Sequence, residues 1–254
     1  MAQDKRIIGE QNTLAVLMYL HRFGWLTSRM LASLVWPAAK QSPAMARRTV
    51  KAMADQKLII KRALSEGGDC YTLSATGARW LNEQEGIGAK SGASLQLGNP
   101  VHRACANWYL IDQIQQGNRV WTEYEIQTGR TPVGNVSGKV PDGLVDTPFG
   151  LTWVEVENAW KNRAERAAIV RLCQRCLFTR DQMSELAPDF YLFRVAIVST
   201  NLDALRAMHR SMMDAHTVGE LTETQAGAIE LVHLPVDKSL VAGPPQQCLL
   251  YDLL

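Results

Sequence analysis

Four charged residues in the second half of the chain have the types and spacing that phosphodiester chemistry uses. Asp142 follows a proline, and Glu155 and Glu157 alternate with valines in a short β-prone run. Because residues two apart in a strand share a face, both glutamates are predicted to point toward Asp142 on the neighbouring strand. Three carboxylates at about 4 Å repel by roughly 1–4 kcal/mol per pair. A divalent cation among them relieves that repulsion, and hard oxygen ligands favour Mg²⁺ or Mn²⁺ over zinc.

A cation held in this way polarises a scissile phosphate, lowers the pKa of a bound water and stabilises the leaving oxygen. Lys161, four residues after Glu157, is predicted to return a positive charge to the site. Glu123 and Glu125, on the preceding predicted strand, are reserve ligands. The alternative interpretation is that the acids line a solvent-facing strand edge, since alternating Glu and Val is ordinary in an amphipathic strand.

Apolar periodicity predicts the elements that must position these side chains. They are a helix over 101–116, strands over 119–126, 138–146 and 151–158, a helix over 163–178, a strand over 191–200, a helix over 202–215 and a strand over 228–236. A turn at 147–150 joins the second and third strands. Helices interleaved with strands are typical of an α/β or α+β fold built on a mixed sheet.

The first 80 residues have a different pattern. They predict a helix over 10–22, a second capped by Thr27 and ended by Trp36, and a third over 42–55 in which Ser42 is the N-cap. A hairpin of 58–64 and 70–73 follows, and Ser74 caps a last helix. The cations that project from the third helix and the base of the hairpin are Arg47, Arg48, Lys51, Lys61 and Arg62.

Charge and composition divide the chain in the same place. The net charge of +2 combines +7 in residues 1–80 with −5 in the remainder, and 46% hydrophobic against 20% charged residues excludes a largely disordered protein. Four glycines in 83–100 indicate a linker, so the predicted domains are 1–82, a linker over 83–99 and 100–254. No apolar run reaches the roughly 18–20 residues of a membrane span, and no signal-peptide core precedes the first helix. We therefore expect a cytoplasmic protein with no membrane association and with cysteines as thiols.

Three helices followed by a two-stranded wing resemble a winged helix-turn-helix of the MarR-like kind over residues 8–82. The resemblance implies that the third helix enters the major groove with Arg47, Arg48 and Lys51, and that Lys61 and Arg62 lie at the base of the wing. The alternative is a winged helix that binds protein. The local charge of +7 favours DNA.

The order αβββαβ followed by αβ, with Asp142 on the second strand and Glu155 on the third, resembles the core of the PD-(D/E)XK restriction-endonuclease superfamily over residues 100–236. The sequence departs from that pattern at Glu157, where the motif places lysine. The resemblance implies a Mg²⁺- or Mn²⁺-dependent endonuclease in which Asp142 and Glu155 bind metal. Glu157 then binds metal or orients water, and Lys161 stabilises the charged phosphorane.

The winged helix, the nuclease core and the run EVENAWK at 155–161 together resemble the MobC-type (MOBC) relaxases of mobilizable plasmids. This implies nicking of one DNA strand at an origin of transfer by metal-dependent hydrolysis, without a tyrosine nucleophile. It also implies an accessory mobilization protein and a coupling protein as partners. Two alternatives stay open: a DNA-binding transcriptional regulator whose nuclease-fold domain is inactive, and a transposase or repair endonuclease subunit.

Overall fold

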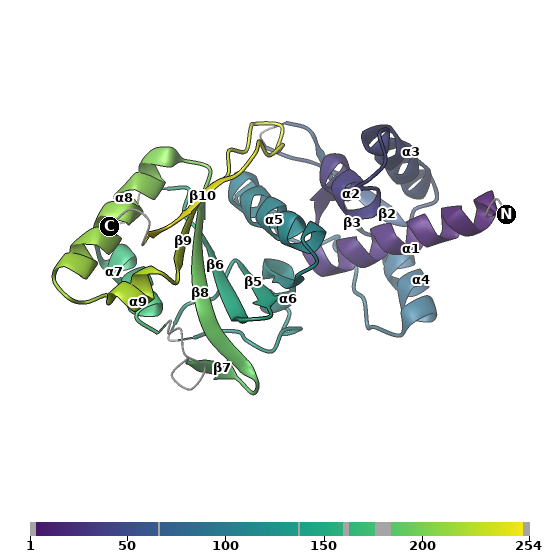
Figure 1. Ribbon diagram of the computed structural model, residues 1–254. Helices are drawn as coiled ribbons and strands as arrows, with labels where there is room; N and C mark the ends of the chain where they lie inside the picture. The colour runs from purple at the N-terminus through teal and green to yellow at the C-terminus, as the bar shows by residue number, and fades with distance from the viewer. Residues whose placement is uncertain (1–3, 66, 137, 160–162, 176–183, 251–254) are drawn as a thin grey trace. The chain divides into compact units, whose positions relative to one another are not determined.

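The computed structural model describes residues 4–65, 67–136, 138–159, 163–175 and 184–250 (Figure 1). The fold is mixed α+β, as expected. The chain divides into two compact units, Met1–Pro100 with Lys238–Val241 and Val101–Asp237 with Ala242–Leu254. Across these described ranges, no helix is long and apolar enough to cross a membrane.

The first unit contains helices, a hairpin and a further helix in the predicted order. The elements are α1 (Lys5–Phe23), β1 (Leu26–Thr27), α2 (Ser28–Val35), α3 (Ser42–Asp55), β2 (Ile59–Ala63), β3 (Asp69–Leu73) and α4 (Ala75–Glu85). The strands form an antiparallel sheet in the order β1-β3-β2. Strand β1 was not predicted, because two residues carry no periodic signal.

Side-chain caps fix where the helices of the first unit begin. The Thr27 hydroxyl accepts the Met30 N–H at the start of α2, and the Ser74 hydroxyl accepts the Gly77 N–H at the start of α4. Both caps confirm the sequence-based prediction. The prediction for α3 was wrong by one residue: Ser42 is the first helical residue, and Gln41 precedes it without a side-chain cap bond.

The segment expected to be a linker is hydrogen-bonded to the first unit. The side chain of Asn82 bonds both the N–H and the C=O of Ala89, at 2.5 and 3.0 Å. The Gly92 N–H donates to the Leu73 carbonyl at 2.9 Å, and Ala89 is buried. Glycine content alone did not reveal these contacts, because the partners of the backbone polar groups lie on α4 and β3.

The second unit is built on a seven-stranded mixed sheet in the order β10-β9-β8-β6-β5-β4, with β7 paired to β8. Its elements are α5 (Pro100–Gln115), β4 (Arg119–Thr122), α6 (Glu123–Gln127), β5 (Gly143–Thr147), β6 (Gly150–Val156), α7 (Arg163–Cys173), β7 (Glu185–Ala187), β8 (Phe190–Ser199), α8 (Leu202–Thr217), α9 (Glu223–Ala226), β9 (Ile229–His233) and β10 (Gln246–Leu249). Strands β4, β5 and β6 are antiparallel, whereas β6, β8 and β9 are parallel.

Helices cover both faces of this sheet (Figure 1). On one face α7 and α8 pack against a core that includes Trp153, Ile169 and Ile197, all fully buried. On the other face α5 lies so close to β5 that a Cβ on Gly143 would meet the Leu110 side chain at 2.9 Å. This close contact fixes the start of β5 against α5.

The first strand of the second unit is shorter than predicted. The expected strand over 119–126 ends at Thr122, and Glu123 and Glu125 lie on helix α6. A capping box explains the difference: the Thr122 hydroxyl accepts the Glu125 N–H, and the Glu125 carboxylate accepts the Thr122 N–H at 2.9 Å. The placement of these two glutamates on a strand was therefore wrong.

Candidate functional site

Asp142 lies directly before β5 and is anchored to β6 by two hydrogen bonds. Its backbone N–H donates to the Val154 carbonyl at 3.0 Å, and its carboxylate accepts the Val156 N–H at 2.8 Å. These two bonds flank Glu155 on the neighbouring strand. The predicted strand over 138–146 begins only at Gly143, so Asp142 is the residue directly before β5. Because neighbouring strands lie about 4.8 Å apart, the backbone of Asp142 is close to that of β6.

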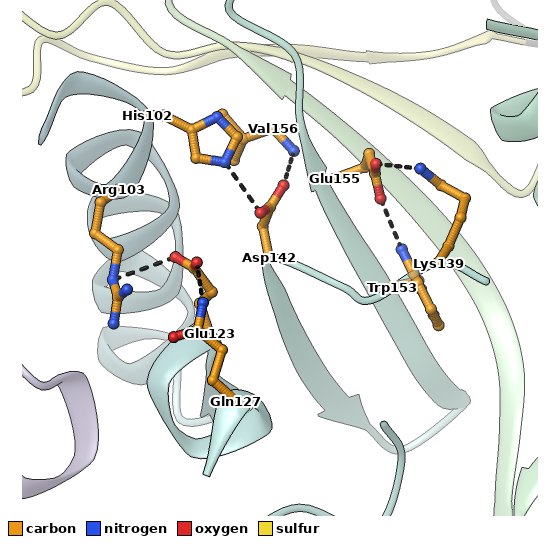
Figure 2. Close-up of polar contacts among 9 residues, drawn as sticks. All are labelled: His102, Arg103, Glu123, Gln127, Lys139, Asp142, Trp153, Glu155 and Val156. Carbon is orange, nitrogen blue, oxygen red and sulfur yellow. Dashed lines mark hydrogen bonds and ion pairs between the residues drawn. The ribbon is translucent and has the colours of Figure 1, made fainter. Parts of the chain in front are cut away.

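His102, in the first turn of α5, contacts the carboxylate of Asp142. Its Nε2 lies 3.0 Å from Asp142 Oδ1 (Figure 2). Burial by itself lowers the pKa of His102, but the hydrogen bond to Asp142 and the charges of Asp142, Glu123 and Glu157 outweigh it, so the pKa is raised above its usual value. The negative charges of three carboxylates therefore all favour the protonated form of this imidazole.

Glu155 is almost fully buried and belongs to a second group of contacts. Its carboxylate accepts the indole N–H of Trp153 at 3.0 Å and lies 2.5 Å from the ammonium nitrogen of Lys139 (Figure 2). Lys139 is held in place by a short backbone bridge with Val136. Glu155 therefore has a protein cation as its counter-ion, supplied from just before Asp142.

Glu123 forms a third polar group with Arg103 of α5. Arg103 Nε lies 3.2 Å from one carboxylate oxygen, and the Gln127 amide donates to the other at 2.6 Å. Burial raises the pKa of Glu123 and the nearby charge of Asp142 raises it further, against the opposing effect of Arg103. Burial likewise lowers the pKa of Arg103. Glu125, by contrast, is occupied by its capping box.

Glu157 is 2% exposed and lies one residue beyond the end of β6. Its backbone N–H donates to the Val198 carbonyl at 2.8 Å, and its own carbonyl accepts the Ser199 hydroxyl at 2.5 Å, so β8 holds it in place. Lys161 lies outside the described residues. The predicted return of positive charge by Lys161 therefore stays a prediction.

The carboxylates have the chemistry of a hard-cation site, and protein groups hold them in their present positions. Among the residues that the structure describes, no group of three or more His, Cys, Asp or Glu side chains lies close enough to hold a metal. The predicted convergence of Asp142, Glu155 and Glu157 is thus not found in these side-chain positions. Their oxygen donors still suit Mg²⁺ or Mn²⁺.

The five cations predicted to contact DNA separate into two groups. Arg47, Arg48 and Lys51 are exposed on α3, opposite the buried Ala46, Val50 and Met53. At the wing, the Lys61 ammonium lies 2.9 Å from Asp69, and a guanidinium N–H of Arg62 donates to the Leu95 carbonyl at 2.5 Å. Lys61 and Arg62 thus have described contacts within the protein, and the described structure gives no such contact for the three cations of α3.

No family model matches the chain, and no curated protein matches it. The site therefore stands on its geometry. Sequence reasoning missed His102, Arg103 and Lys139. The proximity of Lys139 to Asp142 in the sequence was an available signal. The two α5 residues had none, because a long stretch of chain separates them from the carboxylates that they contact.

We expect Lys139 and Glu155 to be energetically coupled. Lys139→Met should lower the free energy of unfolding by about 2 kcal/mol, because it removes the ammonium from a carboxylate that is 5% exposed. Glu155→Gln should lower it by a similar amount. The double variant should lose less than the sum by about 1–2 kcal/mol in urea titrations. Strictly additive losses would show that the contact contributes nothing.

Proposed function

We propose that the protein is a Mg²⁺- or Mn²⁺-dependent DNA-nicking endonuclease of the MobC relaxase type, acting at a plasmid origin of transfer. The observation that carries the proposal is the anchoring of Asp142 on both sides of Glu155, at the adjoining ends of two paired strands. Asp142, Glu123 and Glu157 all act on His102, and acids gathered in this way mark a candidate site for a cation or for phosphate chemistry. Glu157 and Glu123 add to the same negative field.

The order of the elements supports a PD-(D/E)XK-like core. Helix α5 precedes the antiparallel strands β4, β5 and β6, α7 follows, and β8 joins β6 in parallel. The short elements α6, between β4 and β5, and β7, before β8, depart from the αβββαβ order that the sequence predicts, and the rest of the order supports it. In such a core Asp142 and Glu155 would hold the cation, with Glu157 as a further oxygen donor. The bound cation supplies Lewis acidity at the scissile phosphate and a water of lowered pKa.

The chain's own residues have separate parts in this proposal. His102 orients the Asp142 carboxylate, and Trp153 and Lys139 orient that of Glu155. Arg103 balances Glu123, which limits the accumulated negative charge that an incoming DNA phosphate meets. These contacts preorganise the acids before DNA binds.

The first unit would deliver the DNA. The order of its first three helices, α1 to α3, and of the β2–β3 hairpin after them supports a winged helix-turn-helix. The exposed Arg47, Arg48 and Lys51 lie on one face of α3 at i, i+1 and i+4. Arginine on a groove-facing helix contacts phosphates and guanine edges. An accessory mobilization protein and a coupling protein are the partners that this function would require.

One observation favours a second candidate, a DNA-binding regulator with an inactive nuclease fold. Lys139 already neutralises Glu155, His102 occupies one oxygen of Asp142, and Glu157 replaces the lysine of the motif. Under this alternative the ion pairs are structural. Added Mg²⁺ or Mn²⁺ then neither stabilises the protein nor causes cleavage of DNA.

The deciding experiment incubates supercoiled plasmid carrying a cognate origin with the full chain and Mg²⁺ or Mn²⁺. We expect conversion to open circles, suppressed by EDTA. A paired binding assay on duplex DNA should show weaker binding by about 1–3 kcal/mol for Arg48→Ala, whereas Arg22→Ala, which alters a cation outside α3, serves as the control. Duplex binding without metal-dependent nicking would favour the regulator, and the loss of both would contradict the proposal.

A further inference from the structure

Two aromatic rings are stacked at the end of the sheet opposite to the carboxylates. Phe149, in the turn between β5 and β6, is 71% exposed, and its ring lies 5.7 Å from that of Phe193 on β8 with an interplanar angle of 30°. The stacking covers only part of Phe149, so most of its ring stays in contact with water. We call this pair the aromatic platform.

A β-bulge places Phe193 in the aromatic platform. Leu151 of β6 pairs with Leu192, but Thr152 pairs with Arg194, so Phe193 is the extra residue of β8. A bulge re-aims a side chain that regular alternation would send elsewhere. The guanidinium of Arg194 lies 5.3 Å from the centroid of the Phe193 ring, which brings a cation to the same pair of rings.

The backbone that carries Phe149 is also held in place. The Thr147 hydroxyl accepts the Phe149 N–H at 3.3 Å and donates to the Gly150 carbonyl at 2.7 Å. These two bonds order the backbone before and after Phe149. The backbone of the turn that carries Phe149 is therefore ordered in advance, which lowers the entropy that a ligand must offset on binding.

A second cation lies at the same end of the sheet. Arg119 begins β4 and pairs in register with Asp146 near the end of β5, and its guanidinium lies 4.6 Å from the centroid of the Trp121 ring. Because β6 spans seven residues, from Gly150 to Val156, at about 3.3 Å each, the platform lies roughly 20 Å from the carboxylate end. It is thus separate from the candidate site.

We infer that the aromatic platform binds a nucleobase of an unpaired DNA strand by stacking on Phe149. The inference rests on the proposed DNA function and specifies its substrate as partly single-stranded. Every base has a π-face, so a stacking platform tolerates sequence. The exposed Arg119 supplies charge complementary to phosphate at the same end of the sheet, whereas the charge of Arg194 is partly balanced by Glu230 at 3.9 Å. A purely apolar partner would have no use for the exposed cation of Arg119 at this end of the sheet.

The test measures the affinity of the full chain for a fluorescein-labelled oligothymidine, without metal, by fluorescence anisotropy. Phe149→Ala should weaken binding by about 5- to 100-fold, the usual loss when one stacked base loses its aromatic partner. Phe149→Leu should weaken it as much, because an apolar side chain without a ring cannot stack. Phe149→Trp should retain wild-type affinity and show quenched indole fluorescence on binding.

Two controls separate this inference from the proposed function. Val218→Ala changes another side chain that is 71% exposed and should leave the affinity for oligothymidine unchanged. Duplex binding should be the same for Phe149→Ala and wild type. Wild-type affinity in Phe149→Ala, or full affinity in Phe149→Leu, overturns the platform. So does a protein that binds duplex but no oligothymidine, whereas the failure of both DNAs contradicts the proposed function itself. Sedimentation that shows a dimer lost in Phe149→Ala would overturn the inference in favour of self-association.

Discussion

Asp142→Asn is expected to reduce metal-dependent nicking at least about 100-fold. The substitution keeps the size of the side chain and an oxygen for the Val156 N–H, which now donates at 2.8 Å. It removes the negative charge that a divalent cation requires and weakens the contact with His102. The rate of open-circle formation from supercoiled plasmid, followed on agarose gels over a range of Mn²⁺ concentrations, measures the effect.

A matched control lies on the strand that Asp142 precedes. Asp146→Asn alters the same residue type in β5 but at the far end from the carboxylates, so nicking should be unchanged. Glu155→Gln should reproduce the loss. If Asp142→Asn and Glu155→Gln both nick at the wild-type rate, the chemistry occurs elsewhere in the chain. Thermal unfolding of each variant distinguishes lost chemistry from lost fold.

Gly77→Ala is expected to destabilise the first unit by about 3 kcal/mol. Alanine in a helix normally stabilises relative to glycine, but a Cβ at this buried position of α4 would lie 2.0 Å from the Leu58 carbonyl oxygen. That carbonyl already accepts the Ser74 N–H at 3.2 Å, so the backbone has little freedom to retreat. Chemical denaturation followed by circular dichroism measures the loss.

Gly9→Ala, in the same unit, is expected to change the free energy of unfolding in the opposite direction. Gly9 is exposed on α1, and a Cβ added there would meet nothing within 4 Å. The substitution should raise the free energy of unfolding by about 0.5–1 kcal/mol, since alanine has less backbone entropy to lose. An equal effect at both positions would mean that Gly77 is not in close contact with Leu58.

Local sequence signals identified most elements but not their ends. Caps at Thr27 and Ser74 and the apolar face of α3 follow from short-range chemistry, so they were predictable. Glu123 and Glu125 were assigned to a strand because β-prone residues precede them. The reciprocal bonds between Thr122 and Glu125 start a helix there instead, and a capping box of this kind was readable in the sequence.

The sequence by itself determined which acids exist, their spacing around Asp142, and the division of charge between a basic first part and an acidic second part. Only the tertiary structure decided the partners of those acids. Asp142 meets His102 from α5, 40 residues away in the chain, and Glu155 meets Lys139, 16 residues away. Contacts of this kind depend on how helices and strands pack, and hydrophobic periodicity specifies which face of an element is buried without specifying which side chain it meets.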